Sequence, residues 1–471
     1  MSSATDDAPF LRAEQNAGRY RDVYRATRER LTRATVRELA RPSSAERVEH
    51  LLDAAIDLVR AAPTESFPIT AVLDAAGFDA PFVYRYFDSR DHLEWAARLI
   101  EFEATFTADS TMIVERLTSC DSTHEIAEII DVWLQEADKA EARANRMNRF
   151  ASLAAVLRHP EAATPYAAMT QRLLALGSTC TRTLHSRGHL CPAIDPTSMA
   201  EFMFIAPMTR VIVDLYPDLV PHQQWVPVIH RAYAVHLDTS GRTNCGPPHA
   251  RVAVPADENT IDTALHEWLR VRHLHSDATR IISAAVPITR ASLDGDFRLA
   301  EVAHATGFTT SHIYRHFDSK ESLRRTALVA NFGATTTTLL DEFDRVLLAP
   351  DATGAIDHVR AWVHALTSSA DAPGRRLGMQ TLGYLVTGND ATSDALTRNA
   401  IEEIIDRFAT TITTGQERGW FTTAVNPCAL GTFFFGVLTA QAFFDPCPTA
   451  APAAAWTQHM DHLLATMISV D

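Results

Sequence analysis

The sequence predicts an all-α protein built from two copies of one helical unit. Apolar residues recur at helical spacing between Val48 and Val59, whereas the alternation typical of strands is nearly absent from the chain. The stretch Gly77-Phe78 followed by Tyr84-Arg85-Tyr86-Phe87-Asp88-Ser89-Arg90 returns 230 residues later as Gly307-Phe308 followed by Tyr314-Arg315-His316-Phe317-Asp318-Ser319-Lys320. Residues 46–95 and 276–325 share 15 identities without a gap, which indicates an internal duplication.

The duplication extends weakly into the downstream segments, with the offset changed to 231. Arg187-Gly188 matches Arg418-Gly419, and Asp214 matches Asp445. We therefore expect two equivalent two-domain units, arranged as an intramolecular pseudo-dimer. The expected division is an Arg-rich N-terminal extension (1–44), a first helix-turn-helix domain (45–94), a first helical ligand-binding and dimerisation domain (95–238), a linker with a short helix (239–275), a second helix-turn-helix domain (276–325) and a second helical domain (326–471).

Composition limits the function classes. The formal net charge is -15, so any contact with nucleic acid must come from local positive patches. The longest apolar stretch, Ala429 to Phe444, is shorter than the roughly 20 residues that span a bilayer, and residues 1–9 do not resemble a secretory signal. We expect a cytoplasmic protein that does not enter a membrane.

The repeated segment has the pattern of a helix-turn-helix. In the first copy, Ile69 to Ala76 is the expected bracing helix, Gly77 permits a left-handed turn, and Ala80 to Phe87 is the expected recognition helix. The second copy gives Leu299 to Thr306, Gly307, and Thr310 to Phe317. A helix of this kind fits the major groove of DNA.

These two stretches resemble the DNA-binding signature of the TetR family of bacterial transcriptional regulators. The resemblance lies in a small residue, Gly and an apolar residue at the turn, then Tyr-x-x-Phe, then a polar pair with a basic residue and a leucine (Leu93 and Leu323). It implies that Tyr84 and Tyr314 contact phosphate or a thymine methyl group, and that Arg90 and Lys320 contact the DNA backbone. The full set of expected DNA-binding residues is Ala80, Pro81, Tyr84, Arg85, Tyr86, Arg90, Arg298, Thr309, Thr310, Ser311, His312, Tyr314, Arg315, His316 and Lys320.

The two expected DNA-binding units differ in charge. Residues 46–95 carry a net charge of -6, whereas residues 276–325 carry +1. The first recognition helix is preceded by Asp79, which repels phosphate or accepts a hydrogen bond from a cytosine amine. We expect the first unit to bind DNA more weakly or differently, with the Arg-rich extension, of net charge +3, as a compensating arm.

The family resemblance implies dimerisation through two C-terminal helices. A tandem chain could achieve this alone if Pro196 to Leu215 and Gln223 to Leu237 pack against Pro427 to Phe444 and Ala453 to Met467. Tethering gives an effective concentration in roughly the millimolar range. The expected partner is a double-stranded DNA operator of asymmetric sequence. Two alternatives remain open: a homodimer of tandem chains on a longer operator, and an adaptor that has lost DNA binding in the first unit.

A small hydrophobic effector is the second expected partner, and family logic makes the protein a repressor that the effector releases. The candidate pocket residues are Met147, Phe150, Met169, Phe202, Trp362, Met379, Tyr384 and Phe433. No phosphate-binding loop, HExxH or GxSxG occurs, so we expect no enzyme activity and no cofactor. His312 and His316, at i and i+4, are a possible metal pair, but DNA contact explains them better, and we predict no metal.

Overall fold

The chain is all-helical in the part that the structure describes. The computed structural model describes residues 13–35, 42–62, 67–156, 159–237, 258–291, 297–367, 372–386, 391–447 and 450–468, and these contain helices and connecting turns but no strand. Among these residues, no helix combines the length and the apolarity that crossing a bilayer requires. The predicted all-α class is confirmed.

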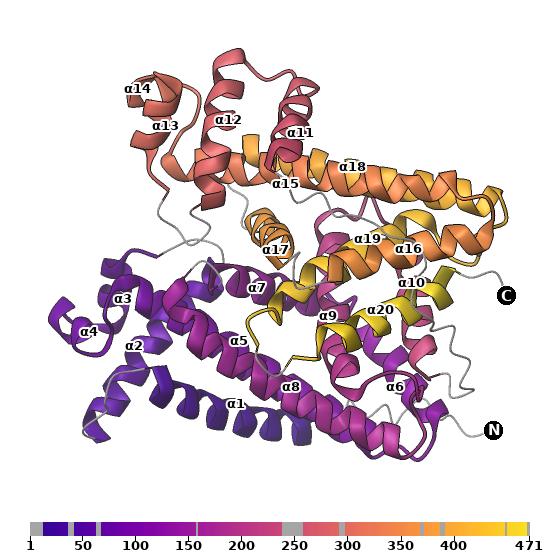
Figure 1. The fold of residues 1–471 in the computed structure, drawn as a ribbon. Coiled ribbons are helices and arrows are strands. Elements are labelled where there is room, and N and C mark those ends of the chain that lie inside the picture. Colours follow the sequence, from indigo (N-terminus) through magenta and orange to yellow (C-terminus); the bar gives the residue numbers. More distant parts are fainter. Residues whose placement is uncertain are drawn as a thin grey trace.

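The helices fall into two successive sets, which we call the first half and the second half (Figure 1). The first half comprises α1 (Ala13–Thr35), α2 (Pro42–Ala61), α3 (Ile69–Ala76), α4 (Ala80–Tyr86), α5 (Arg90–Thr118), α6 (Thr123–Glu136), α7 (Ala140–Val156), η2 (Pro160–Ala162), α8 (Ala163–Ser186), α9 (Pro196–Leu215) and α10 (His222–Leu237). The second half comprises α11 (Glu258–Arg270), α12 (Ser276–Ala291), α13 (Leu299–Thr306), α14 (Thr310–Ile313), α15 (Lys320–Asp344), η3 (Arg345–Leu348), α16 (Ala352–Thr367), α17 (Ala372–Val386), α18 (Ala391–Glu417), α19 (Pro427–Ala440), η5 (Gln441–Phe443) and α20 (Ala453–Ile468).

Equivalent turns of the two halves have the same backbone conformation. Among the described residues, the glycines with positive φ are Gly77 and Gly188 in the first half and Gly307 and Gly419 in the second, all with φ between 68° and 76°. These are two pairs of matching positions, and each glycine follows the end of a helix, where the left-handed conformation costs glycine little. The duplication therefore preserved the turns that end these helices.

A buried ion pair is also repeated. In the first half, Arg146 of α7 contacts Asp214 at the end of α9 with its Nε (2.9 Å) and donates from an Nη to the carbonyl of Ala137 (2.8 Å). In the second half, Arg375 of α17 contacts Asp445 (Nε 3.1 Å, Nη 2.7 Å) and donates to the carbonyl of Leu366 (2.6 Å). The equivalent contacts show that the repeat covers the downstream helices as well as the turns.

The Arg-rich extension forms α1, which packs along α5. Its arginines pair with acids of the body, since Arg30 contacts Glu103 (2.7 Å) and Arg19 contacts Glu115. Tyr24 donates a hydrogen bond to Glu101 (2.9 Å). The described part of the extension is therefore bound to the first half, and these side chains do not form a free arm.

α9 and α10 of the first half pack against α19 and α20 of the second, and α7 packs against α17. The first four are the segments that the sequence predicts to pack together. Their contact is largely aromatic, with Phe202 beside Phe433 (6.4 Å between ring centroids). The hydroxyl of Tyr166 in α8 donates to the carbonyl of Phe443 (3.0 Å), which adds a buried polar link between the halves.

A buried histidine pair lies in the same contact. His236 Nδ1 is 2.5 Å from the carbonyl of Ala232, which can only accept, so His236 Nε2 must accept from His459 Nε2 at 2.6 Å. His459 Nδ1 then carries no proton and lies 3.1 Å from the Ser198 hydroxyl, for whose single proton it competes with the carbonyl of Asp195 (2.8 Å). Burial lowers the pKa of His236 to about 3 and holds the pKa of His459 well below its usual range, so both rings are neutral.

Candidate nucleic-acid interface and effector cavity

Two short helix pairs carry the expected DNA-binding residues. In each half a bracing helix (α3 or α13) ends at a left-handed glycine (Gly77 or Gly307), and a short helix (α4 or α14) follows after two residues. The side chains of Asp79 and Thr309 cap these short helices by accepting from a backbone N–H three residues on, both at 3.2 Å. The helices and turns occur where the sequence predicts them, although α14 ends at Ile313 and continues as a turn.

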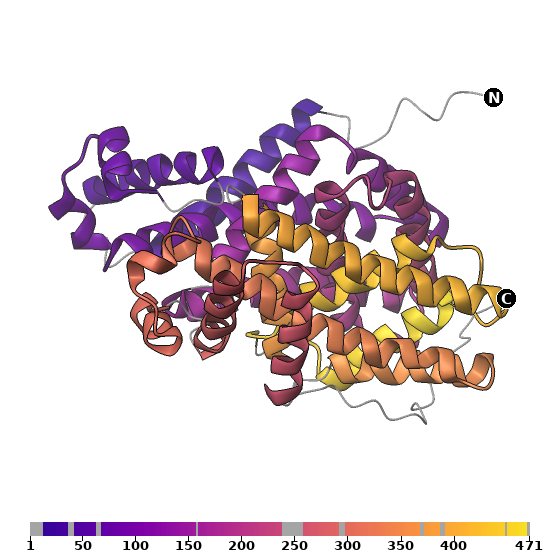
Figure 2. The same cartoon turned by 90° about the horizontal axis from the view of Figure 1, so that it is seen from above.

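Both views of the molecule place α3–α4 and α13–α14 toward the same end, the left in Figures 1 and 2. The interface between the halves and the end of α20 lie away from them. A single extended ligand could therefore approach both short helix pairs from one side.

Each short helix pair presents one tyrosine to solvent. Tyr84 is 48% exposed and Tyr314 is 49% exposed, and among the described residues only Val271 and Leu348 are other large apolar side chains with comparable exposure. The two tyrosines are equivalent in the repeat, 230 residues apart. Singly exposed aromatic side chains are common at protein surfaces, so the exposure makes both rings accessible to a partner but does not by itself identify one.

Most of the other expected contact residues are also accessible. Arg90 is half-exposed and pairs with the neighbouring Asp91 (2.8 Å), and Lys320 is the first residue of α15, beside the cap Ser319. Ala80 is half-buried. The remaining exposed members of the expected set are Pro81, Arg85, Arg298, Thr309, Thr310, Ser311, Arg315 and Lys320.

Three expected contact residues point elsewhere. Tyr86 is only 5% exposed because its ring packs against Phe82 (5.2 Å between centroids), so its assignment to the DNA-binding surface is corrected: it is a core residue. His312 and His316 turn toward the start of α12, where their Nε2 atoms lie 3.0 and 4.0 Å from Asp277 Oδ2. These two imidazoles are partly buried rather than fully presented to solvent.

The first half contains a large apolar cavity of about 290 Å³ between α5, α6, α7, α8, α9 and α10. Its apolar wall includes Phe106, Ile113, Trp133, Gly177, Met203 and Tyr233. Arg146, Arg149 and Arg210 reach one end of it. A cavity of this size and lining suits a small, mainly apolar molecule that carries a polar or anionic group.

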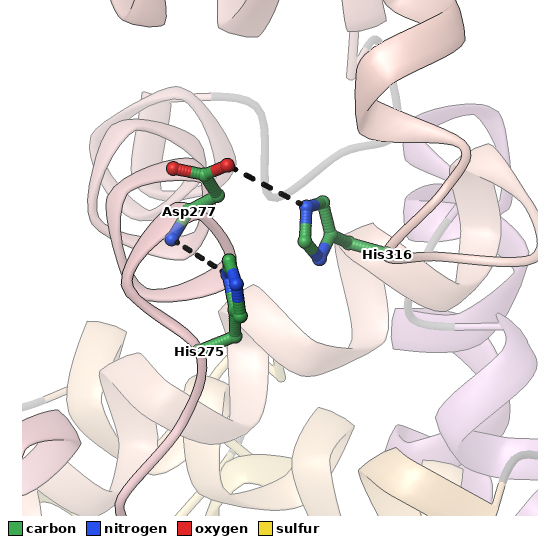
Figure 3. Close-up of side chains that lie close together, drawn as sticks. All are labelled: His275, Asp277 and His316. Carbon is green, nitrogen blue, oxygen red and sulfur yellow. Dashed lines mark hydrogen bonds and ion pairs between the residues drawn. The ribbon is translucent and has the colours of Figure 1, made fainter.

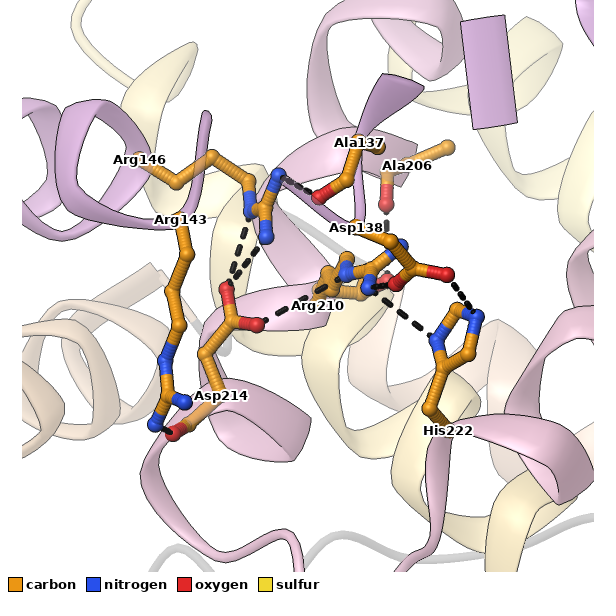
Figure 4. A network of polar contacts seen from close by, with 9 residues as sticks. Ala137, Asp138, Arg143, Arg146, Ala206, Arg210, Asp214 and His222 are labelled. Carbon is orange, nitrogen blue, oxygen red and sulfur yellow. Dashed lines mark hydrogen bonds and ion pairs between the residues drawn. The ribbon is translucent and has the colours of Figure 1, made fainter. Parts of the chain in front are cut away.

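Two of these arginines, Arg146 and Arg210, belong to a connected network of charged groups (Figure 4). Arg210 contacts Asp138 and lies 3.0 Å from His222 Nδ1, while its Nε is 3.6 Å from Asp214. Burial lowers the pKa of Arg146 and of Arg210, and Asp214 opposes that effect for both. Because Asp214 is shared, a ligand group that contacts either guanidinium also perturbs the packing of α7 against α9.

The equivalent region of the second half is nearly filled, with a cavity of only about 70 Å³. Trp362, which matches Trp133 of the first half, packs against Phe343 and Phe408 (5.0 and 5.8 Å). With the offset of 231 found at the ends of α8 and α18, Phe408 corresponds to Gly177. The first half thus lacks a phenyl ring at the point where the second half has one.

The predicted pocket residues are mostly not pocket residues. Met147, Phe150, Met169 and Phe202 do not line the large cavity, and Phe433 and Met379 do not line the small one; of the seven whose side chains are described, Trp362 alone lines one of these two cavities. Phe150, Phe202 and Phe433 instead pack between the halves. The side chain of Tyr384 lies outside the described part of the structure.

No protein-family model matches the chain, and no curated protein sequence matches it significantly.

Proposed function

We propose that this chain is a sequence-specific DNA-binding transcriptional regulator of the TetR type. The observation that carries the proposal is the pair of exposed tyrosines, Tyr84 and Tyr314, at equivalent positions of two capped helix–glycine–helix turns. A tyrosine at the surface of such a turn suits contact with a phosphate or a thymine methyl group. Both tyrosines belong to helix pairs at the same end of the molecule, which supports their simultaneous contact with one DNA duplex.

The two proposed DNA contacts are unequal. The neighbours of Tyr314 are Thr310, Ser311 and Arg315, all exposed, whereas Tyr84 follows the apolar Ala80 and Pro81. Hydroxyl and guanidinium groups can donate to base edges, but Ala and Pro side chains cannot. The second half is therefore the stronger candidate for sequence recognition, and two different contacts favour an asymmetric operator.

The proposed effector occupies the large cavity of the first half. Helix α5 connects this cavity to the first DNA-binding turn, because it begins at Arg90, just after the turn, and its later residues Phe106 and Ile113 line the cavity. A ligand that displaces the middle of α5 would also move the turn. We propose that this movement releases DNA, which makes the protein a repressor relieved by a small apolar ligand.

Selection of bound fragments from genomic DNA of the source organism tests the proposal. Enriched fragments should share one motif, and binding to it should fall for Tyr314→Ala while a Tyr84→Ala variant retains part of the affinity. Absence of any enriched sequence would support the alternative of an adaptor without DNA binding. Footprints twice the expected length would support a homodimer of tandem chains.

A further inference from the structure

Four metal-ligating side chains gather where α12 begins and α14 ends. His275 immediately precedes α12, and Asp277 lies in the first turn of that helix. His312 lies in α14, and His316 follows it in the next turn. Figure 3 shows His275 and Asp277 together at the start of α12, with His316 facing Asp277 from the neighbouring segment.

The distances are close to those of a metal site. The candidate ligand atoms of His275, Asp277 and His316 all lie within 4.8 Å of one another. Asp277 Oδ2 is 3.0 Å from His312 Nε2 and 4.0 Å from His316 Nε2. In a tetrahedral zinc site with bonds of about 2.0 to 2.2 Å, neighbouring ligand atoms are about 3.3 to 3.6 Å apart, so small shifts would bring His275, Asp277 and His316 to these separations. His312 contacts Asp277 but lies outside this group of three, so its ring must move further to join the shell.

The types of ligand atom in this cluster favour one class of metal ion. Three imidazoles and one carboxylate favour Zn²⁺, Co²⁺ or Ni²⁺ over Mg²⁺ and Ca²⁺, which prefer oxygen. Without an ion, His275 Nδ1 accepts a hydrogen bond from the backbone N–H of Asp277 (3.2 Å), so in its neutral form the ring carries its proton on Nε2. Binding of an ion through Nδ1 replaces this hydrogen bond. His275 is exposed and the other three residues are partly exposed, so an ion can enter from solvent.

The first half joins the same two elements without any metal ligand. The positions equivalent to His275, Asp277, His312 and His316 are Ala45, Arg47, Phe82 and Tyr86. There the Arg47 guanidinium lies over the rings of Phe82 and Phe78, at 4.2 and 5.0 Å from their centroids. A cation–π contact thus holds the first pair of helices together. In the second half, all four positions carry residues that ligate metals.

We propose that His275, Asp277, His312 and His316 bind one divalent transition-metal ion, with Zn²⁺ as the first candidate. The bound ion ties the start of α12 to the segment that carries Tyr314, and it replaces the attraction between His312 and Asp277 by stronger bonds. The proposal does not depend on DNA binding, because metal binding is measured on the protein alone.

Titration of the tag-free, metal-stripped full chain tests this site. Co²⁺ should bind with one ion per chain and give the intense visible absorption typical of tetrahedral coordination, and Zn²⁺ should displace it. We expect His316→Ala to weaken Co²⁺ binding at least tenfold. The matched control is His304→Ala, an exposed histidine on α13, which should bind Co²⁺ as the unaltered chain does.

A triple variant with Asp277→Arg, His312→Phe and His316→Tyr introduces the residues of the first half. Because the first half holds the same elements together with these side chains, the variant is expected to fold, which circular dichroism would verify, and to lose the site. Binding that survives the triple substitution would overturn the proposal by assigning the ion to others of the 20 histidines. Absence of Co²⁺ or Zn²⁺ binding by the unaltered chain at micromolar concentrations would also overturn it.

Discussion

The two halves of this chain keep the same scaffold but fill it differently. Both retain the Arg–Asp–carbonyl contact that holds the downstream helices, through Arg146 in one half and Arg375 in the other. At one interior point, however, the first half has Gly177 and the second has Phe408, and the cavities measure about 290 and 70 Å³. The two halves therefore share the Arg–Asp ion pair and the glycine turns. They differ in their interiors, because the cavity of the first half is open and that of the second is nearly filled.

In each half, the helix that packs against this position carries a residue whose size complements the glycine or the phenylalanine. A Cβ on Gly177 would lie 3.1 Å from Ala200 Cβ, whereas Phe408 packs so closely on Gly431 that a Cβ there would lie 2.5 Å from it. Under the offset of 231, Gly177 corresponds to Phe408, and Ala200 corresponds to Gly431. The larger residue of each contacting pair is therefore on α9 in the first half and on α18 in the second. The open cavity is therefore in the first half, where we propose that a ligand binds, and the equivalent interior of the second half is packed.

Removing the ring that closes the second half should have the largest effect. Phe408→Ala is expected to lower the free energy of unfolding by about 3 to 5 kcal/mol, because the ring is buried against Phe343 and Trp362. Urea denaturation of the variant and the unaltered chain measures this change. A loss below about 1 kcal/mol would contradict the claim that this ring supports the second half.

A buried carboxyl between the halves should make stability depend on pH. Burial raises the pKa of Glu201 to about 8, although the backbone N–H of Ala451 donates to it. The folded state therefore retains a proton that the unfolded state loses near its ordinary value of 4.5, so stability should fall as pH rises from 4.5 through 8. The expected loss is on the order of a few kcal/mol.

The variant Glu201→Gln tests this dependence, since an amide does not titrate and its oxygen can still accept from Ala451. Urea midpoints at pH 6 and pH 8.5 should differ less for the variant than for the unaltered chain, with the variant the more stable of the two at pH 8.5. Equal pH slopes for both proteins would show that Glu201 is ionised in the folded state.

Substitution of the exposed tyrosines should separate the two proposed DNA contacts. Tyr314→Ala is expected to cost about 1 to 3 kcal/mol of binding to the selected operator, and Tyr84→Ala should cost less, because its surroundings offer fewer donors. Fluorescence anisotropy at fixed salt measures both affinities. Tyr86→Phe is the matched control, since that buried ring should not affect DNA binding. A larger loss for Tyr84→Ala would reverse the proposed order.

Closing the first cavity should abolish ligand binding with a smaller effect on stability. The double variant Gly177→Phe with Ala200→Gly introduces the pair found in the second half. We expect it to bind 1-anilinonaphthalene-8-sulfonate, an apolar dye with an anionic group, at least tenfold more weakly, about 1.4 kcal/mol. Ala200→Gly alone should retain dye binding. Unchanged affinity in the double variant would place the dye outside this cavity.

The sequence predicted the helices before the turns well, because a left-handed glycine ends each of them locally. Ile69 to Ala76 and Leu299 to Thr306 begin and end as expected, and Gly77 and Gly307 are left-handed. The side-chain environments were harder to predict. Tyr86 follows Arg85 in an apparent contact segment, yet its position on the inner face of α4 buries it.

The cavity of the first half could not be predicted from aromatic residues. Aromatic side chains such as Phe202 fill space, so they mark packed regions, whereas a cavity requires a missing side chain. The informative signal is the contrast between Gly177 and Phe408 under the repeat offset of 231, which is visible in the sequence once the halves are aligned. The His275 and Asp277 ligands were likewise missed because they are far in sequence from His312, and only the fold unites them.

The central claim is that one chain acts as a pseudo-dimer on DNA. The most direct test is the native mass of the complex between the full chain and the enriched genomic fragment, read from the same sample as the binding selection. A pseudo-dimer should give one 52.0 kDa chain per duplex on an asymmetric site. Two chains on a longer site, or no enriched DNA at all, would contradict it.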